Sequence, residues 1–270
     1  MRAFSRRLLD ENVDNPMPHL TLHFFGSFQA WLDDKPIADF RPGRVQNLLA
    51  YLVLEAKQAH ARATLAALFW PDEPETAAKQ NLRQALYQLR QLLGEGNAAE
   101  TQPHPFLLIT RDTVQFNPAS AYTLDVAAFQ THLAQQQLAA AVAFYQGDLL
   151  PSLSSDSPAF EEWLLLQREN LHMQVLTALT QLTTQALAQT DYAQAQHFAR
   201  RQLMLEPWRE AAHRQLMLAL ARSGDRSAAL TQYEICRRVL QAELGVEPDA
   251  ETQALVEEIR KGDLRFTIFD

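Results

Sequence analysis

Four leucines in the first third of the chain recur at a spacing typical of one face of an α-helix. They follow one another at steps of four, three and four positions: Leu82, Leu86, Leu89 and Leu93. That spacing predicts an amphipathic helix over residues 76–93. At about 100° per residue, the opposite face carries amides, guanidinium groups and a phenol, but no acid. Its members are Gln80, Arg83, Gln84, Tyr87 and Gln91, with Lys79 and Arg90 at its edges.

The polar face of this helix has two interpretations. Arg and Gln side chains match base edges in the major groove of DNA, and Arg and Lys match phosphates. An ordinary solvated helix face has a similar composition, so the helix alone does not decide between them. The segments on either side of the helix favour DNA.

These flanking segments predict a winged helix-turn-helix with an added N-terminal sheet. The expected elements, in order, are strands over 20–24, 28–32 and 36–40, helices from Pro42, over 62–69 and over 76–93, and hairpin strands over 106–110 and 113–116. Thr76 is expected to cap the third helix, and Gly94 or Gly96 to end it. In such a module the third helix enters the major groove, and the hairpin that turns near Arg111, the wing, reaches an adjacent groove or phosphates.

Beyond Pro118 the sequence predicts helices only. The expected helices cover 125–145, 157–189, 191–205, 208–223, 225–243 and 250–261. The segment that begins at Asp191 recurs at Asp225, 34 residues later, and each copy opens a helix. Helix pairs with this period are typical of tetratricopeptide repeats, where small residues such as Ala195 and Ala229 let paired helices approach closely. Such an array presents a groove to a protein or peptide.

The length of 270 residues allows two domains, and the predicted fold is mainly α. We expect a winged-helix domain over 18–117 and an all-α, tetratricopeptide-like domain over 118–263. Residues 1–17 are expected to be a disordered leader, and 264–270 a tail or the stump of a longer chain.

The net charge of −8 has the wrong sign for a generic nucleic-acid binder. The acidity lies mainly in the second half. Residues 18–117 hold nine Lys/Arg and ten Asp/Glu, whereas residues 118–270 hold twelve and nineteen. DNA binding would therefore rest on a local patch, and non-specific affinity should be modest.

Several motifs occur in a fixed order along the chain. They are LHFFGSF at 22–28, LLAYL at 48–52, LAALFWPD at 65–72, NLRQALYQLR at 81–90, YQGDLLP at 145–151 and GVEPD at 245–249. This ordered set resembles the Streptomyces antibiotic regulatory protein (SARP) family, in which a winged helix precedes a bacterial transcriptional activator domain. The resemblance implies a sequence-specific DNA-binding transcriptional regulator, expected to be an activator.

The same resemblance implies double-stranded DNA as a partner, and RNA polymerase or another protein as a partner of the helical repeats. A dimer would fit the repeated promoter sites of the family. The expected DNA contacts are Lys79, Arg83, Gln84, Tyr87, Arg90, Arg44 and Arg111. Base reading is assigned to Arg83 and Gln84, and phosphate contact to Lys79 and Arg90. Arg44 and Arg111 would contact the sugar–phosphate backbone of the DNA. Tyr87 could instead pack against a neighbouring side chain.

Nothing in the sequence predicts an enzyme. The eight histidines are scattered, and none pairs with another at metal-ligand spacing, so no catalytic residue, metal or cofactor is expected. His172, His197 and His213 are expected at surface or groove positions, and Cys236 in the core. A Gly-rich phosphate loop for ATP is absent.

No apolar run reaches the length of a membrane span, and no secretory signal is present, so a cytoplasmic protein is expected. The alternative function is a protein-interaction scaffold, in which the repeat groove binds a partner and the winged helix does not bind DNA. The near-neutral N-terminal half supports this alternative. The acid-free polar face of helix 76–93 argues against it.

Overall fold

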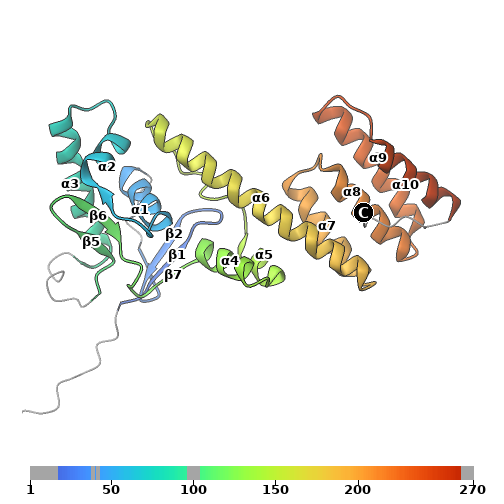
Figure 1. Cartoon of the computed structure of the whole chain (residues 1–270), viewed down its shortest axis with the longest axis horizontal. Helices are drawn as coiled ribbons and strands as arrows, with labels where there is room; N and C mark the ends of the chain where they lie inside the picture. The colour runs from blue at the N-terminus through green and yellow to red at the C-terminus, as the bar shows by residue number, and fades with distance from the viewer. Residues whose placement is uncertain (1–17, 38–39, 41–42, 96–103, 263–270) are drawn as a thin grey trace, which may run out of the picture. The chain divides into compact units, whose positions relative to one another are not determined.

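The computed structural model describes residues 18–37, 40, 43–95 and 104–262. The chain forms two compact units (Figure 1). Unit 1 comprises Met1–Ala127 and Leu149–Leu166, and unit 2 comprises Ala128–Asp148 and Gln167–Asp270. Leu149–Leu166 thus groups with the N-terminal unit by its contacts, and the domain boundaries drawn from the sequence stay predictions. The expected leader, the tail, Pro42 and Gly96 lie outside the described residues.

Unit 1 contains a four-stranded sheet. Its strands, in spatial order, are β3 (Lys35–Pro36), β2 (Gln29–Leu32), β1 (Leu20–His23) and β7 (Tyr122–Leu124). Leu22 in β1 faces Ala30 of the antiparallel β2 and Leu124 of the parallel β7. The prediction that the chain is wholly helical beyond Pro118 is therefore wrong at β7. A run of three residues is too short to show a period-two pattern.

The start of α4 (Asp125–Ala134) is fixed to this sheet by one side chain. The Asp125 carboxylate accepts hydrogen bonds from the backbone N–H groups of Phe24 and Phe25, each at 2.9 Å. The strand β7 and the carboxylate of Asp125 thus attach the segment after the hairpin to the N-terminal sheet.

Three helices and a three-stranded sheet complete the winged-helix part of unit 1 (Figure 1). They are α1 (Arg44–Leu54), α2 (Arg62–Phe69), α3 (Glu75–Leu92), and the strands β4 (His60–Ala61), β6 (Thr113–Phe116) and β5 (Leu107–Ile109) in spatial order. The expected order of sheet, three helices and hairpin is confirmed, and β4 is an addition. Leu52, Leu65 and Leu89 are fully buried, so the apolar faces of all three helices meet in one core.

Both ends of α3 depend on local backbone chemistry. The prediction that Thr76 caps the helix is wrong, because the cap is Pro74, whose carbonyl accepts the N–H of Ala78 at 2.9 Å. The ring of Pro74 fixes its φ at −53°, which ends the preceding turn without a side-chain cap. Gly94 ends the helix as predicted, with a φ of +75° that favours glycine.

The named elements of unit 2 are all helices within its described residues. Besides most of α4 it contains α5 (Leu138–Phe144), the greater part of α6 (Pro158–Ala188), α7 (Tyr192–Leu205), α8 (Glu210–Arg222), α9 (Arg226–Glu243) and α10 (Ala250–Lys261). The single helix expected over 125–145 is wrong, because the chain turns at Gln136 with a φ of +59°. The N–H of Gln137 bonds the carbonyl of His132 at 2.9 Å, which closes α4 without a glycine.

The repeat seen in the sequence is a repeat of structure. Asp191 and Asp225 each cap a helix by accepting the N–H three residues later, at 3.0 and 2.9 Å. Ala195 and Ala229 are fully buried, as the small-residue argument predicts. Successive helices from α7 to α10 pack against one another as a tetratricopeptide-like array (Figure 1).

Candidate nucleic-acid interface

The polar face of α3 is uncovered in unit 1. The leucines at 82, 86 and 89 are at most 3% exposed. On the opposite side, Gln80, Arg83, Gln84, Tyr87 and Gln91 are exposed, and Tyr87 keeps 59% of its surface. Tyr87 therefore does not pack into a neighbouring hydrophobic cluster. The helix hides its leucines and presents cationic, amide and phenolic groups.

Three of the expected cationic contacts have partners within the chain. Lys79 forms an ion pair with Glu75, whose pKa is lowered by the hydrogen bond and the charge of Lys79. Arg90 donates from Nη2 to the backbone carbonyl of Glu95 at 3.2 Å. Both cations thus have an acceptor within unit 1.

Arg44, the third, lies at the start of α1. Its guanidinium is 3.6 Å from a carboxylate oxygen of Asp156, and its Cζ is 5.8 Å from the centre of the Trp70 ring. Both partners belong to unit 1. In contrast, Arg83 and Arg111 are exposed, and their side chains make no hydrogen bond or ion pair within the described part of the chain.

The two edges of the polar face differ. At about 100° per residue, Lys79, Arg83 and Arg90 fall along one edge of α3. The other edge borders an open hollow of about 720 Å³. Its lining includes Arg44, Trp70, Asn81, Gln84, Tyr87 and Gln88. The structure therefore brings three expected contacts, Arg44, Gln84 and Tyr87, to one hollow, and places the other cations of α3 along the opposite edge.

Sequence reasoning missed part of this hollow. Asn81 and Gln88 line it, although neither was an expected contact. A signal was present, because Asn81, Gln84, Gln88 and Gln91 follow one another at steps of three, four and three, which aligns their amides along the helix. Trp70 could not be found in this way, since its place in the lining depends on how the end of α2 meets α1.

Arg111 lies in the turn between β5 and β6. The hydroxyl of Thr110 accepts the N–H groups of Asp112 and Thr113 at 3.2 and 2.9 Å, which makes a compact turn. The N–H of Arg62 donates to the carbonyl of Asp112 at 2.9 Å and joins the start of α2 to this turn. Arg111 is therefore an exposed cation on an ordered tip.

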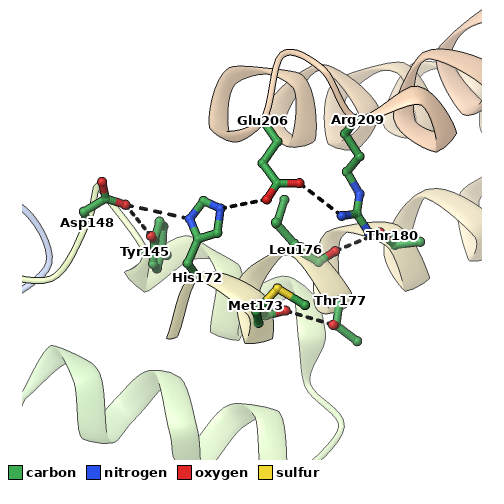
Figure 2. Close-up of polar contacts among 9 residues, drawn as sticks. All are labelled: Tyr145, Asp148, His172, Met173, Leu176, Thr177, Thr180, Glu206 and Arg209. Carbon is green, nitrogen blue, oxygen red and sulfur yellow. Dashed lines mark hydrogen bonds and ion pairs between the residues drawn. The ribbon is translucent and has the colours of Figure 1, made fainter. Parts of the chain in front are cut away.

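Unit 2 contains a cluster of polar contacts centred on His172 of α6 (Figure 2). The ring lies 3.9 Å from Asp148 through Nδ1 and 3.3 Å from Glu206 through Nε2. Arg209 donates to the other oxygen of Glu206 at 3.2 Å, and the hydroxyl of Tyr145 donates to Asp148 at 2.8 Å. Burial and then the neighbouring Asp148 raise the pKa of Tyr145. The cluster fastens the segment after α5 and the α7–α8 loop to α6.

The other two repeat histidines differ from each other. His197 is exposed, as expected. The surface or groove position expected for His213 is wrong, because this residue is only 2% exposed. Its Nε2 donates to the carbonyl of Pro207 at 2.8 Å, and its Nδ1 accepts from the amide nitrogen of Gln232 at 2.7 Å. Burial lowers its pKa. Cys236 is buried, as predicted, and burial raises its pKa to about 12, so the thiol is a core group.

Comparison with known proteins places the chain in a family. The family model of the bacterial transcriptional activator domain matches residues 112–260, which is more than half of the chain. The chain belongs to this family. The bacterial transcriptional activator domain begins in the wing turn and ends in α10, so α3 and all seven expected DNA contacts precede it.

Two further comparisons extend over the N-terminal elements. Regulatory protein AfsR of Streptomyces griseus is 25% identical over 256 residues, which cover 88% of this chain and 24% of that protein. The structure of Mycobacterium tuberculosis EmbR in complex with a low affinity phosphopeptide has a TM-score of 0.66 and 21% sequence identity, over 90% of this chain and 65% of that chain. This chain therefore spans about a quarter of the length of AfsR.

With its bacterial transcriptional activator domain and these relatives, the chain is of the SARP type. The resemblance found in the sequence is confirmed, and so is the predicted fold class. Among the described helices, none has both the length and the apolar character needed to cross a membrane.

Proposed function

We propose that unit 1 binds double-stranded DNA, with α3 in the major groove and the β5–β6 turn against the sugar–phosphate backbone. The observation that carries this proposal is the uncovered face of α3, where Arg83 and Gln84 are exposed on a helix whose other face is buried. Arg matches guanine and Gln matches adenine through paired hydrogen bonds, and a rigid helix presents both in fixed order.

The contacts divide by their chemistry. Arg83 and Gln84 read bases, with Tyr87 beside them, and Lys79 and Arg90 contact phosphates. Arg44 and Arg111 contact the backbone from the first helix and the wing. The internal partner of Lys79 does not prevent this role, because its ion pair with Glu75 is exposed and solvent screens such pairs, so they add little to stability. A phosphate can replace the carboxylate.

The helical domain is proposed to contact a protein, with RNA polymerase as the partner that the SARP resemblance favours. The tetratricopeptide-like array from α7 to α10 supplies the type of surface that such repeats use for proteins and peptides. Binding as a dimer to repeated promoter sites belongs to the same proposal, as do the domain boundaries at 18–117 and 118–263.

The proposal is tested by selecting binding sequences for the full chain from a random pool of duplex DNA. Arg83→Ala should then reduce discrimination between the selected site and single-base variants by about 1–3 kcal/mol at the position that Arg83 contacts. Arg238→Ala is the matched control, because Arg238 is an exposed arginine of α9 in unit 2. Equal discrimination by both variants would contradict the assignment of Arg83.

The second candidate function is the protein-interaction scaffold. The observation that favours it is that Lys79, Arg90 and Arg44 all have partners within unit 1, which lowers the free positive charge near α3. The two functions differ in their response to salt. A DNA-binding unit enriches a sequence from the pool and loses affinity steeply as salt rises, whereas a scaffold enriches none.

A further inference from the structure

The carboxylate of Glu95 joins the end of α3 to the start of β5. The α3 helix closes with two hydrogen bonds, from the N–H of Gly94 to Gln91 at 3.1 Å and from the N–H of Glu95 to Arg90 at 2.7 Å. This pair of bonds is the Schellman motif, and it turns the chain so that Glu95 points inward. The Glu95 residue is only 1% exposed.

At this position Glu95 holds the strand that opens the wing. Its Oε1 accepts the backbone N–H of Phe106. The N–H of Leu107, the first residue of β5, also lowers the pKa of this carboxyl. The carbonyl of Phe106 accepts the N–H of Asn117 at 2.8 Å from the other side. The start of the hairpin is therefore held between the end of β6 and the end of α3.

The same residue also orients a proposed DNA contact. Arg90 donates from Nη2 to the main-chain carbonyl of Glu95 at 3.2 Å, and the two backbones are joined by the Schellman bond. Arg90 lies on the cationic edge of α3. A shift of Glu95 would therefore move both a phosphate-binding side chain and the root of the wing.

Holding a carboxylate here is costly for the fold. Burial raises the pKa of Glu95, and the N–H groups of Phe106 and Leu107 and the charge of Arg90 oppose that rise. The second oxygen, Oε2, is buried and has no hydrogen-bond partner among the described residues. A buried polar atom without a partner lowers stability. An uncharged acceptor, such as the amide of glutamine, would avoid the cost of burying the charge.

We propose that Glu95 is a positioning residue for DNA binding, which fixes the wing and Arg90 relative to α3 so that all three reach one duplex. This inference rests on the proposed DNA-binding function. It predicts that loss of the carboxylate uncouples the wing from the helix and removes phosphate contacts, while α3 itself keeps its base contacts.

The test compares Glu95→Ala, Glu95→Asp and Glu95→Gln in the full chain, bound to the DNA site that the wild type selects. The Ala and Asp variants should bind this DNA about tenfold more weakly at moderate salt. The slope of log affinity against log salt should also become less negative by about one or two, because each lost phosphate contact reduces the slope by about one. Glu95→Gln should restore both values, because its amide oxygen can accept the same N–H groups.

Glu73→Gln is the control, since Glu73 is an exposed carboxylate of unit 1 and should leave affinity and slope nearly unchanged. If Glu95→Ala does not fold, Glu95→Asp carries the test, because it keeps the charge and shortens the reach by one methylene. Hydrogen exchange at Phe106 and Leu107 should speed up in the Ala and Asp variants and not in the Gln variant.

The outcomes separate the two proposals. A wild type that selects no DNA overturns the proposed function and this inference with it. A wild type that binds DNA, with folded Ala and Asp variants of unchanged affinity and salt slope, overturns the inference about Glu95 alone. A Gln variant that behaves like the Ala variant also overturns it, because a positioning hydrogen bond should be restored by the amide.

Discussion

Glu75 and Lys79 form an ion pair on the first turn of α3, with side chains that are 77% and 49% exposed. The pair brings an acid close to the surface where a phosphate would bind. The carboxylate also stabilises the N-terminus of the helix through the helix dipole. The pair therefore supports the helix while it occupies a cation proposed for DNA.

Replacing Glu75 with Gln should release Lys79 and remove a repulsive charge. We expect DNA affinity at low salt to rise by about two- to fivefold, because Lys79 no longer has to break its ion pair with Glu75 before it contacts a phosphate. Fluorescence anisotropy with the selected duplex measures the change. Glu73→Gln removes an equal charge beside the helix, but it leaves the ion pair between Lys79 and Glu75 intact. Equal affinity gains in both variants would show that only net charge matters.

The buried carboxylate of Glu95 should make stability depend on pH. Its folded pKa is raised, mainly by burial, above the ordinary value of 4.5. The folded state therefore binds a proton more tightly than the unfolded state, and stability falls as pH rises from 4.5 through the folded pKa. Glu95→Gln lacks this titration. The melting temperature of the variant minus that of the wild type should therefore increase as the pH rises from the ordinary pKa of the carboxyl toward neutrality.

Thermal unfolding monitored by circular dichroism at several pH values tests this expectation. The difference between the variant and the wild type should widen with rising pH and then level off. A difference that is constant, or that narrows toward neutral pH, contradicts a raised pKa at Glu95.

A buried amide network in unit 2 should be sensitive to a single substitution. Gln202 donates to Thr183 and Gln215 at 2.9 Å, and its oxygen accepts the hydroxyl of Thr180 at 2.9 Å. Gln202→Leu removes these bonds and leaves the side-chain oxygen of Gln215 without its donor, while the hydroxyls of Thr180 and Thr183 keep their bonds to main-chain carbonyls. We expect the free energy of unfolding of unit 2 to fall by about 1–3 kcal/mol. Denaturant unfolding measures the loss. Gln181→Leu on the exposed side of α6 is the control and should change stability by less than about 0.5 kcal/mol.

The helices were largely predictable because their signals are local and repeated. The leucine spacing defined α3 to within one residue at each end, and the aspartates at 191 and 225 marked the starts of α7 and α9. Helix breaks without glycine were not predictable. Gln136 adopts a left-handed conformation because hydrogen bonds close α4 around it, and its neighbours in the sequence give no sign of this.

The candidate interface was predictable in its residue types and not in its internal contacts. The periodicity of α3 places Arg83 and Gln84 outward whatever the rest of the chain does. The partners of Arg44, Arg90 and Lys79 differ in kind. Glu75 lies one helical turn from Lys79 and could be inferred, but Asp156 meets Arg44 only because Leu149–Leu166 returns to unit 1. Such long-range returns have no local signature.

The central claim is that the uncovered face of α3 binds DNA through several phosphates as well as bases. The most direct measurement is the affinity of the full chain for its selected duplex as a function of salt concentration. Contacts from Lys79, Arg90, Arg44 and Arg111 predict a slope of log affinity against log salt of about −3 to −4. A slope near zero, or a chain that enriches no sequence from the random pool, contradicts the claim.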